Sequence, residues 1–145
     1  MRHFDFASAW TLPHPASRVY AALEDVEHYP AWWPQVVACL KVGEDEGVVL
    51  CRSSLPYTLE LHVALLRRTP EVLESSLGGD LDGWVRWRIV PAGDGCRVHF
   101  EQSVDVTGRV LGLAARIARP LLLWNHARML DGAREGLLHH LDPTG

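Results

Sequence analysis

Between Val36 and Val106 the sequence alternates apolar and polar residues in short runs, and turn-forming residues separate the runs. A period of two is typical of β-strands, and short breaks containing glycine, proline or aspartate favour hairpins. The expected strands are residues 36–42, 48–54, 57–67, 72–77, 84–90 and 96–106. Strands joined by such short connections predict an antiparallel meander.

The segment before this meander predicts one more strand and two short helical elements. Residues 3–10 alternate between two faces and end shortly before Pro13, which indicates a strand. Apolar residues at helical spacing predict an amphipathic helix over residues 16–26. In the aromatic segment that follows, Pro30 and Pro34 limit the structure to a short helical turn or a compact loop.

The last segment, residues 110–141, places its apolar residues at helical spacing and has no turn signal except Pro120. We therefore expect one long helix, kinked or broken near Pro120. A long sheet with one polar face must bury its other face, and this helix is the largest element available to cover it. The sequence thus predicts an α+β fold in which a seven-stranded antiparallel sheet curves around a C-terminal helix.

Composition sets the class of protein. With 145 residues, 48% of them apolar, the chain fits a single domain spanning residues 1–145. The formal net charge of -4 comes from acidic and basic residues mixed along the sequence, so nucleic acid is not expected as a partner. The three cysteines, Cys39, Cys51 and Cys96, form no CxxC pair, and a reduced cytoplasmic location fits them best.

No membrane insertion and no cofactor are expected. The most apolar stretch, residues 110–124, is short and contains Arg116, Arg119 and Pro120, and the N-terminus lacks the pattern of a signal peptide. Glycine-rich phosphate loops and the GxSxG and HExxH motifs are absent. The pair at residues 139–140, two histidines, is expected in a C-terminal tail rather than in a metal site.

The run WTLPHPASRVYAALEDVEHYPAWWP, the six-strand meander and the terminal helix resemble the START-related, polyketide cyclase/dehydrase-like (SRPBCC) superfamily. The resemblance covers almost the whole chain. Its most specific residues are Asp25, Tyr29, Pro30, Trp32, Trp33, Pro34 and the run Trp124, Asn125, His126. It implies a helix-grip fold, with two short helices between the first two strands and a deep apolar cavity between sheet and helix. Members bind lipids, sterols, plant hormones, polyketides or quinones, and some catalyse aldol cyclisation or dehydration.

Strand parity predicts which residues face this cavity, because one register places all the apolar sets on the helix side. The inner sets are Tyr57, Leu59, Leu61, Val63 and Leu65; Val85, Trp87 and Ile89; and Val98, Phe100, Gln102 and Val104. The outer residues that this register excludes from the site are Arg86, Arg88, His62 and His99. We expect the two arginines to pair across strands with Glu101 or Glu60.

Few polar residues are expected to point inward. They are Tyr57, Ser75 and Gln102. A few polar groups in an apolar cavity orient a small ligand. The alternative is that each of them satisfies a neighbouring backbone group. Both interpretations stay open for each residue.

The sharpest candidate is His126, which lies on an apolar helical stripe with Leu122, Met129, Leu130, Ala133 and Leu137. A histidine there can act as a general acid or base, or donate a hydrogen bond to a ligand carbonyl. The neighbouring Asn125 can do similar polar work. The alternative is a core histidine bonded to Tyr57, Gln102 or a buried water.

The aromatic residues 29–33 also have two interpretations. They form the lip of the cavity, with Trp33 contacting the ligand, or they pack the first helix against the sheet end. Because adjacent side chains cannot share one direction, Trp32 and Trp33 are expected to divide these roles. If Trp32 or Trp84 is exposed on an apolar patch, a homodimer is plausible.

The sequence therefore predicts a protein that binds a hydrophobic, ring-containing small molecule of polyketide or lipid type. Cyclisation or dehydration of that molecule without a cofactor stays open, and His126 is the expected catalytic residue. The expected ligand-binding residues are Trp33, Tyr57, Leu61, Ser75, Trp87, Gln102, Asn125 and Met129. The alternatives are a non-catalytic lipid or quinone carrier or sensor, and a protein-interaction module with a vestigial pocket.

Overall fold

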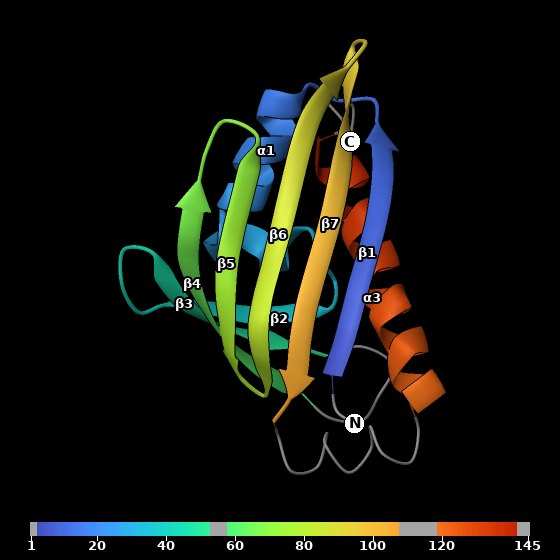
Figure 1. Cartoon of the computed structure of the whole chain (residues 1–145). Helices are drawn as coiled ribbons and strands as arrows, with labels where there is room; N and C mark the ends of the chain where they lie inside the picture. The colour runs from blue at the N-terminus through green and yellow to red at the C-terminus, as the bar shows by residue number, and fades with distance from the viewer. Residues whose placement is uncertain (1–2, 53–57, 108–118, 142–145) are drawn as a thin grey trace.

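The computed structural model describes residues 3–52, 58–107 and 119–141. Seven strands form an antiparallel sheet in the order β1-β7-β6-β5-β4-β3-β2, which is the predicted meander with the first strand added beside the last. The strands are β1 His3–Leu12, β2 Val36–Lys41, β3 Glu46–Cys51, β4 Leu59–Arg68, β5 Val72–Gly79, β6 Leu81–Ala92 and β7 Gly95–Val106. Figure 1 shows the sheet curving around the C-terminal helix α3 (Arg119–Leu141), which confirms the helix-grip fold.

Two short helical elements connect β1 to β2, as predicted. The helix α1 (Ala16–Glu24) buries Val19 and Leu23, which lie four residues apart and therefore on one face. The 3-10 helix η1 (Val26–Ala31) contains Pro30, whose missing N–H is compatible with so short an element. Together, α1 and η1 bring the aromatic segment against the concave side of the sheet.

The helix α3 has Pro120 in its first turn, where a residue without an N–H donor costs no hydrogen bond. Residues 110–118, which we expected to continue this helix beyond a kink, lie outside the described residues. His139 and His140 belong to the last turn of α3, so the prediction of a tail there was wrong. The helix extends this far because Leu141 is buried in the core and anchors its end.

The C-terminal half of α3 packs directly on the segment that follows η1. Leu130, Ala133 and Leu137 are buried along one stripe of the helix, as their spacing predicts. A Cβ atom on Gly136 would clash with the carbonyl oxygen of Trp32, so the helix approaches this backbone as closely as a glycine allows. This contact fixes the distance between α3 and the aromatic segment.

The outer face of the sheet carries the polar residues that parity assigned to it. The Arg86 Nε donates a hydrogen bond of 2.8 Å to Glu74, and its Nη1 lies 3.6 Å from Glu101. The predicted pairing of Arg86 with Glu101 is confirmed, and the alternative partner Glu60 is wrong, because that carboxylate accepts a 2.8 Å hydrogen bond from the Nε2 of His62 instead. Among the described residues, no helix is long and apolar enough to cross a bilayer.

Candidate functional site

A cavity of about 860 Å³ lies between the concave face of the sheet, η1 and α3. Its walls are mostly apolar because strand parity turns one side chain in two toward α3. The apolar lining includes Trp33, Leu61, Val63, Leu73, Val85, Trp87, Phe100 and Met129. A concave apolar space of this size is the usual form of a small-molecule site.

Most of the predicted site residues lie in this lining. Those that do are Trp33, Leu61, Ser75, Trp87, Gln102, His126 and Met129. Tyr57 lies outside the described residues. Asn125 is half-buried beside His126 on α3, but it is not among the described residues that line the cavity.

A polar pair formed by β7 and α3 lines the cavity. The Nε2–H of His126 donates a hydrogen bond of 2.8 Å to the Oε1 of Gln102, whose side chain is 8% exposed. The imidazole also stacks on Phe6 of β1, with 3.5 Å between the ring centroids. This is the arrangement expected for a core histidine bonded to Gln102, although both side chains also line the cavity.

Burial sets the charge of this pair. Desolvation lowers the pKa of His126 from its ordinary value of 6.5 to about 4, because the charged imidazolium is disfavoured away from water. The imidazole is therefore neutral at pH 7. With Nε2 donating to Gln102, the Nδ1 of His126 carries the lone pair.

The pair also leaves a donor unused. Within the described residues, the amide nitrogen of Gln102 has no hydrogen-bond partner. The nitrogen is not among the fully buried side-chain atoms that lack a partner, so it is accessible from the cavity, where a ligand acceptor can take a hydrogen bond from it.

Trp32 and Trp33 divide their roles, as their adjacency predicts. Trp33 lines the cavity and donates a 3.0 Å hydrogen bond from its Nε1 to the carbonyl of Met129, which joins the aromatic segment to α3. Trp32 is 5% exposed and packs edge-on against Tyr29. It therefore cannot belong to the exposed apolar patch that we considered for a homodimer. Trp84 is half-buried, and the Arg86 guanidinium lies 4.7 Å from its ring centroid.

Two cysteines also line the cavity, on β2 and β3. Burial raises the pKa of the Cys51 thiol to about 12, and burial likewise raises the pKa of the Cys39 thiol. Both side chains are therefore protonated at neutral pH. Because the thiolate is the nucleophilic form, neither cysteine is suited to covalent catalysis.

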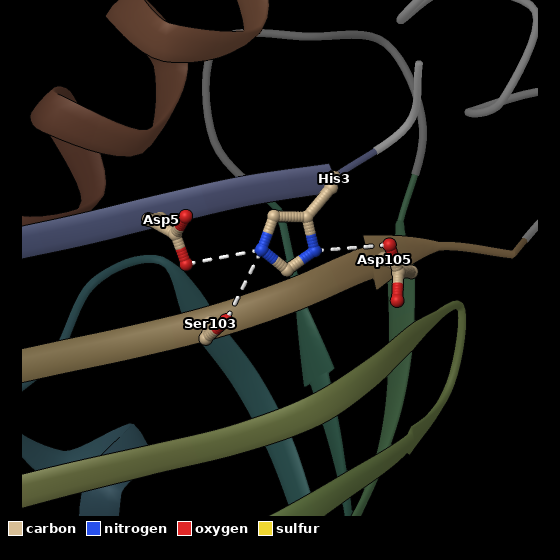
Figure 2. Close-up of polar contacts among 4 residues, drawn as sticks. All are labelled: His3, Asp5, Ser103 and Asp105. Carbon is tan, nitrogen blue, oxygen red and sulfur yellow. Dashed lines mark hydrogen bonds and ion pairs between the residues drawn. The ribbon is translucent and has the colours of Figure 1, made fainter.

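A second polar cluster lies on the outer side of the sheet edge, at the start of β1 and the end of β7 (Figure 2). The Nδ1 of His3 is 3.0 Å from Asp105 Oδ1, and its Nε2 is 3.1 Å from Asp5 Oδ1 and 3.2 Å from Ser103 Oγ. Serine, histidine and aspartate in this order suggest a nucleophile with its base.

The charges contradict that interpretation. Hydrogen bonds to Asp105 and Asp5 raise the pKa of His3, because two carboxylates stabilise the imidazolium. Both ring nitrogens of His3 lie within hydrogen-bond distance of carboxylate oxygens, which only accept, so this geometry leaves neither nitrogen free to take a proton from Ser103. The cluster therefore ties β1 to β7 and is not a nucleophilic site. The sequence analysis did not predict this cluster, because its residues belong to the first and the last strand of the chain, which become neighbours only in the folded sheet.

One end of the cavity is lined by charged residues that strand parity did not address. They come from the end of α1, from η1, from the β2–β3 hairpin and from the end of β4. The acidic run Glu44, Asp45 and Glu46, which lies between the predicted strands 36–42 and 48–54, is the signal in the sequence that could have indicated this charged end. Among the described residues, no cluster of histidine, cysteine, aspartate and glutamate is arranged to hold a metal ion.

Solved structures with the same fold are numerous. A START superfamily protein from Mycobacterium smegmatis aligns with a TM-score of 0.79 and 16% identity, covering 97% of this chain and 99% of that one. A protein from Thermus thermophilus aligns with a TM-score of 0.76 and 18% identity, covering 96% and 100%. The Zhui aromatase/cyclase from Streptomyces sp. R1128 aligns with a TM-score of 0.77 and 13% identity, covering 95% and 93%.

These identities show a shared fold and leave function to the site. A search of curated protein sequences finds no match. The model of the family described as polyketide cyclase / dehydrase and lipid transport matches residues 12–127, a stretch that runs from the end of β1 into α3. The chain belongs to the polyketide cyclase / dehydrase and lipid transport family.

Proposed function

We propose that this protein binds a hydrophobic, ring-containing small molecule in the cavity between the sheet and α3. The observation that carries the proposal is a cavity of about 860 Å³ with apolar walls and one buried, neutral polar pair. Sites for small organic ligands have volumes of roughly 300–1,000 Å³ and few polar groups. The family description, which names polyketide chemistry and lipid transport, supports the same ligand class.

The aromatic walls favour a ligand that contains rings. Trp87 lies at the centre, with its ring centroid 6.5 Å from that of Trp33 and 4.7 Å from that of Phe100. These rings are tilted or perpendicular to one another, so their faces and edges are both presented along the walls. Aromatic pairs gain about 0.5–1.5 kcal/mol in such geometries beyond the area that they bury.

The polar pair favours a ligand with a carbonyl group. The unused amide N–H of Gln102 offers one hydrogen bond to an acceptor, and the His126 ring holds the amide in place through its own hydrogen bond. Because both groups are neutral, a neutral acceptor such as a ketone or quinone oxygen suits them. This deep contact would fix the orientation of an otherwise apolar ligand.

The second candidate is cyclisation or dehydration of the bound ligand, which the family description and the position of His126 in the cavity wall support. A pKa of about 4 leaves His126 unprotonated at pH 7, but makes it a weak base. Under this candidate, positioning of the ligand supplies most of the acceleration. His126→Gln would then lower turnover of a poly-carbonyl substrate while ligand affinity changes little.

Binding is tested by calorimetric titration with (hydroxymethyl)anthraquinone, a neutral ring compound with carbonyl acceptors. We expect saturable binding to the wild-type protein. Leu61→Trp, which adds volume inside the cavity, should abolish it. The matched control is Leu66→Trp on the same strand, where the side chain is 59% exposed, and this variant should bind normally. Absence of binding to the wild type, or equal binding to both variants, contradicts the proposal.

A further inference from the structure

The open end of the cavity carries a strong excess of negative charge. The six carboxylates that line it are Glu24, Asp25, Glu27, Glu44, Asp45 and Glu46. The two cations in the same lining are Lys41 and Arg68. We call these eight residues the acidic mouth. They surround the entrance from α1, η1, the β2–β3 hairpin and β4, and all eight are exposed.

Part of this charge is neutralised within the mouth. The Nε of Arg68 lies 2.7 Å from Glu24 Oε2, and its Nη2 lies 3.5 Å from Asp45 Oδ1. The Oδ2 of Asp25 accepts a hydrogen bond of 2.7 Å from the Nδ1 of His28, which lies outside the mouth and is not counted among its cations. Arg68 is therefore committed to two carboxylates from different elements, and it is not available to bind an anionic ligand.

The remaining carboxylates are uncompensated. Within the described residues, Glu27, Glu44 and Glu46 make no ion pair, and Lys41 is the single cation of the mouth that is also unpaired. Six carboxylates against two cations leave an excess of four negative charges at the entrance, and three of the carboxylates have no ion-pair partner among the described residues. A carboxylate or phosphate on a ligand would be repelled there.

Among the described residues, no charged side chain lines the opposite end of the same cavity. The register of the strands gives the separation between the two ends. Gln102 pairs with Val85, Val85 with Ser75, and Ser75 with Leu65. The N–H of Leu65 then bonds the carbonyl of Asp45 in the mouth. Four steps of about 4.8 Å place the Gln102 end roughly 19 Å from the mouth, measured along the curved sheet.

The neutral end itself points to a ligand. Gln102 is more than nine-tenths buried, lines the cavity and has an amide nitrogen without a partner among the described residues. A ligand that places a carbonyl at this amide extends its other end along the cavity toward the acidic mouth.

We propose that the acidic mouth selects among ligands by their charge, and this proposal rests on the proposed function. The ligand class is a ring-containing carbonyl compound whose outer end is neutral or cationic, and compounds with a carboxylate or phosphate at that end are excluded. At physiological salt, charges within about 8 Å of each other still interact, whereas screening by dissolved ions removes most of the interaction at longer distances. At that range, an excess of four negative charges weakens binding of an anion by about tenfold.

The test compares three anthraquinones that carry the same six-carbon chain, ended by a hydroxyl, a carboxylate or an ammonium group, so that the chain reaches from the Gln102 end toward the mouth. We expect the ammonium compound to bind at least as tightly as the hydroxyl compound, and the carboxylate to bind about tenfold more weakly at low salt. Higher salt should reduce this difference. If the neutral compound binds and the carboxylate binds equally well, the charge selection is overturned and the proposed function stands. If no derivative binds, both fail.

A triple variant assigns the selection to the mouth. Glu27→Gln, Glu44→Gln and Glu46→Gln remove its three unpaired carboxylates and should bring the carboxylate derivative close to the affinity of the neutral one. The control carries Asp82→Asn, Asp131→Asn and Glu135→Gln, which change the net charge equally at exposed positions outside the cavity lining. Discrimination that survives in the mouth variant, or disappears equally in the control, contradicts the proposal.

Discussion

A histidine lies against each face of the sheet and bonds a residue of another element, and the two histidines differ in their exposure and in the charge of their partners. On the concave face, His126 is buried against Phe6, bonds a neutral amide and has its pKa lowered to about 4. On the convex face, His3 is exposed, bonds two carboxylates and has its pKa raised. The same residue type is therefore uncharged inside the fold and favours the charged form outside it.

This difference shows how the fold separates its tasks. The outer face uses charge to join neighbouring strands, because ionic groups there stay in contact with water. The inner face keeps its polar groups neutral, since a charge in an apolar cavity would cost several kcal/mol of desolvation. Among the described residues that line the cavity, the charged ones all belong to the mouth, and the inner walls are apolar around the neutral pair.

The largest expected contrast concerns two tryptophans on opposite faces of β6. Trp87 is 6% exposed and packs against Phe100, so Trp87→Ala should lower the free energy of unfolding by about 3–5 kcal/mol. Trp84 is half-buried under Arg86, so Trp84→Ala should cost about 1 kcal/mol. Urea denaturation measures both variants, and equal losses would contradict the assignment of the two faces.

The next effect is the pH dependence due to His126. Its pKa is about 4 in the folded protein and 6.5 when unperturbed, so the unfolded state binds the proton more readily between these values. Its contribution to stability is constant above pH 6.5 and falls by about 3 kcal/mol as the pH drops from 7 to 4. This loss should be absent in His126→Gln. A wild-type protein that follows the variant at every pH would contradict the buried neutral histidine.

The hydrogen bond offered by Gln102 predicts a smaller effect on binding. Gln102→Leu should weaken the binding of (hydroxymethyl)anthraquinone by about tenfold, because the variant loses one hydrogen bond to the ligand. Binding of (hydroxymethyl)anthracene, which has the same shape and lacks the ring carbonyls, should change little. Calorimetric titration of both compounds measures the difference. An equal loss for both would assign Gln102 a packing role only.

The smallest effect concerns His3 and has the opposite sign. Because its pKa is raised in the folded protein, the stability that it contributes is fully present below pH 6.5 and is lost as the pH rises through the raised value. His3→Gln should therefore be less stable than the wild type at pH 6 and approach it at alkaline pH. Thermal unfolding across this range tests the sign, and a deficit that grows with pH would contradict the outer ion pairs.

Strand parity predicted the fold and the side chains that face inward, because a period of two allows only two assignments of a strand's residues to the faces of the sheet. Leu61, Trp87 and Gln102 belong to three strands, yet each falls on the face that its own alternation indicates. One helix long enough to cover that face left little choice of architecture. The division between Trp32 and Trp33 followed in the same way from their adjacency.

Contacts between segments that are distant in the chain could not be predicted from the sequence. Arg86 was expected to pair with Glu101 or Glu60. Glu101 does face it in register at 3.6 Å, but the shorter contact of 2.8 Å is to Glu74, its partner on the neighbouring strand β5, which was not predicted. Alternation within a strand does not determine the register between strands. The acidic mouth needs three chain segments to meet at one end of the cavity, and the neutral state of His126 depends on burial, which no spacing rule supplies.

Occupation of the cavity by a ring compound is the central claim, and Met129 reports on it directly. The sequence has two methionines, Met1 and Met129, and Met129 lines the cavity. With methyl-labelled methionine, titration of (hydroxymethyl)anthraquinone should shift the Met129 methyl resonance saturably through the ring current, and should produce nuclear Overhauser contacts between that methyl group and the ligand. Saturable binding that leaves the Met129 resonance unchanged would contradict the account.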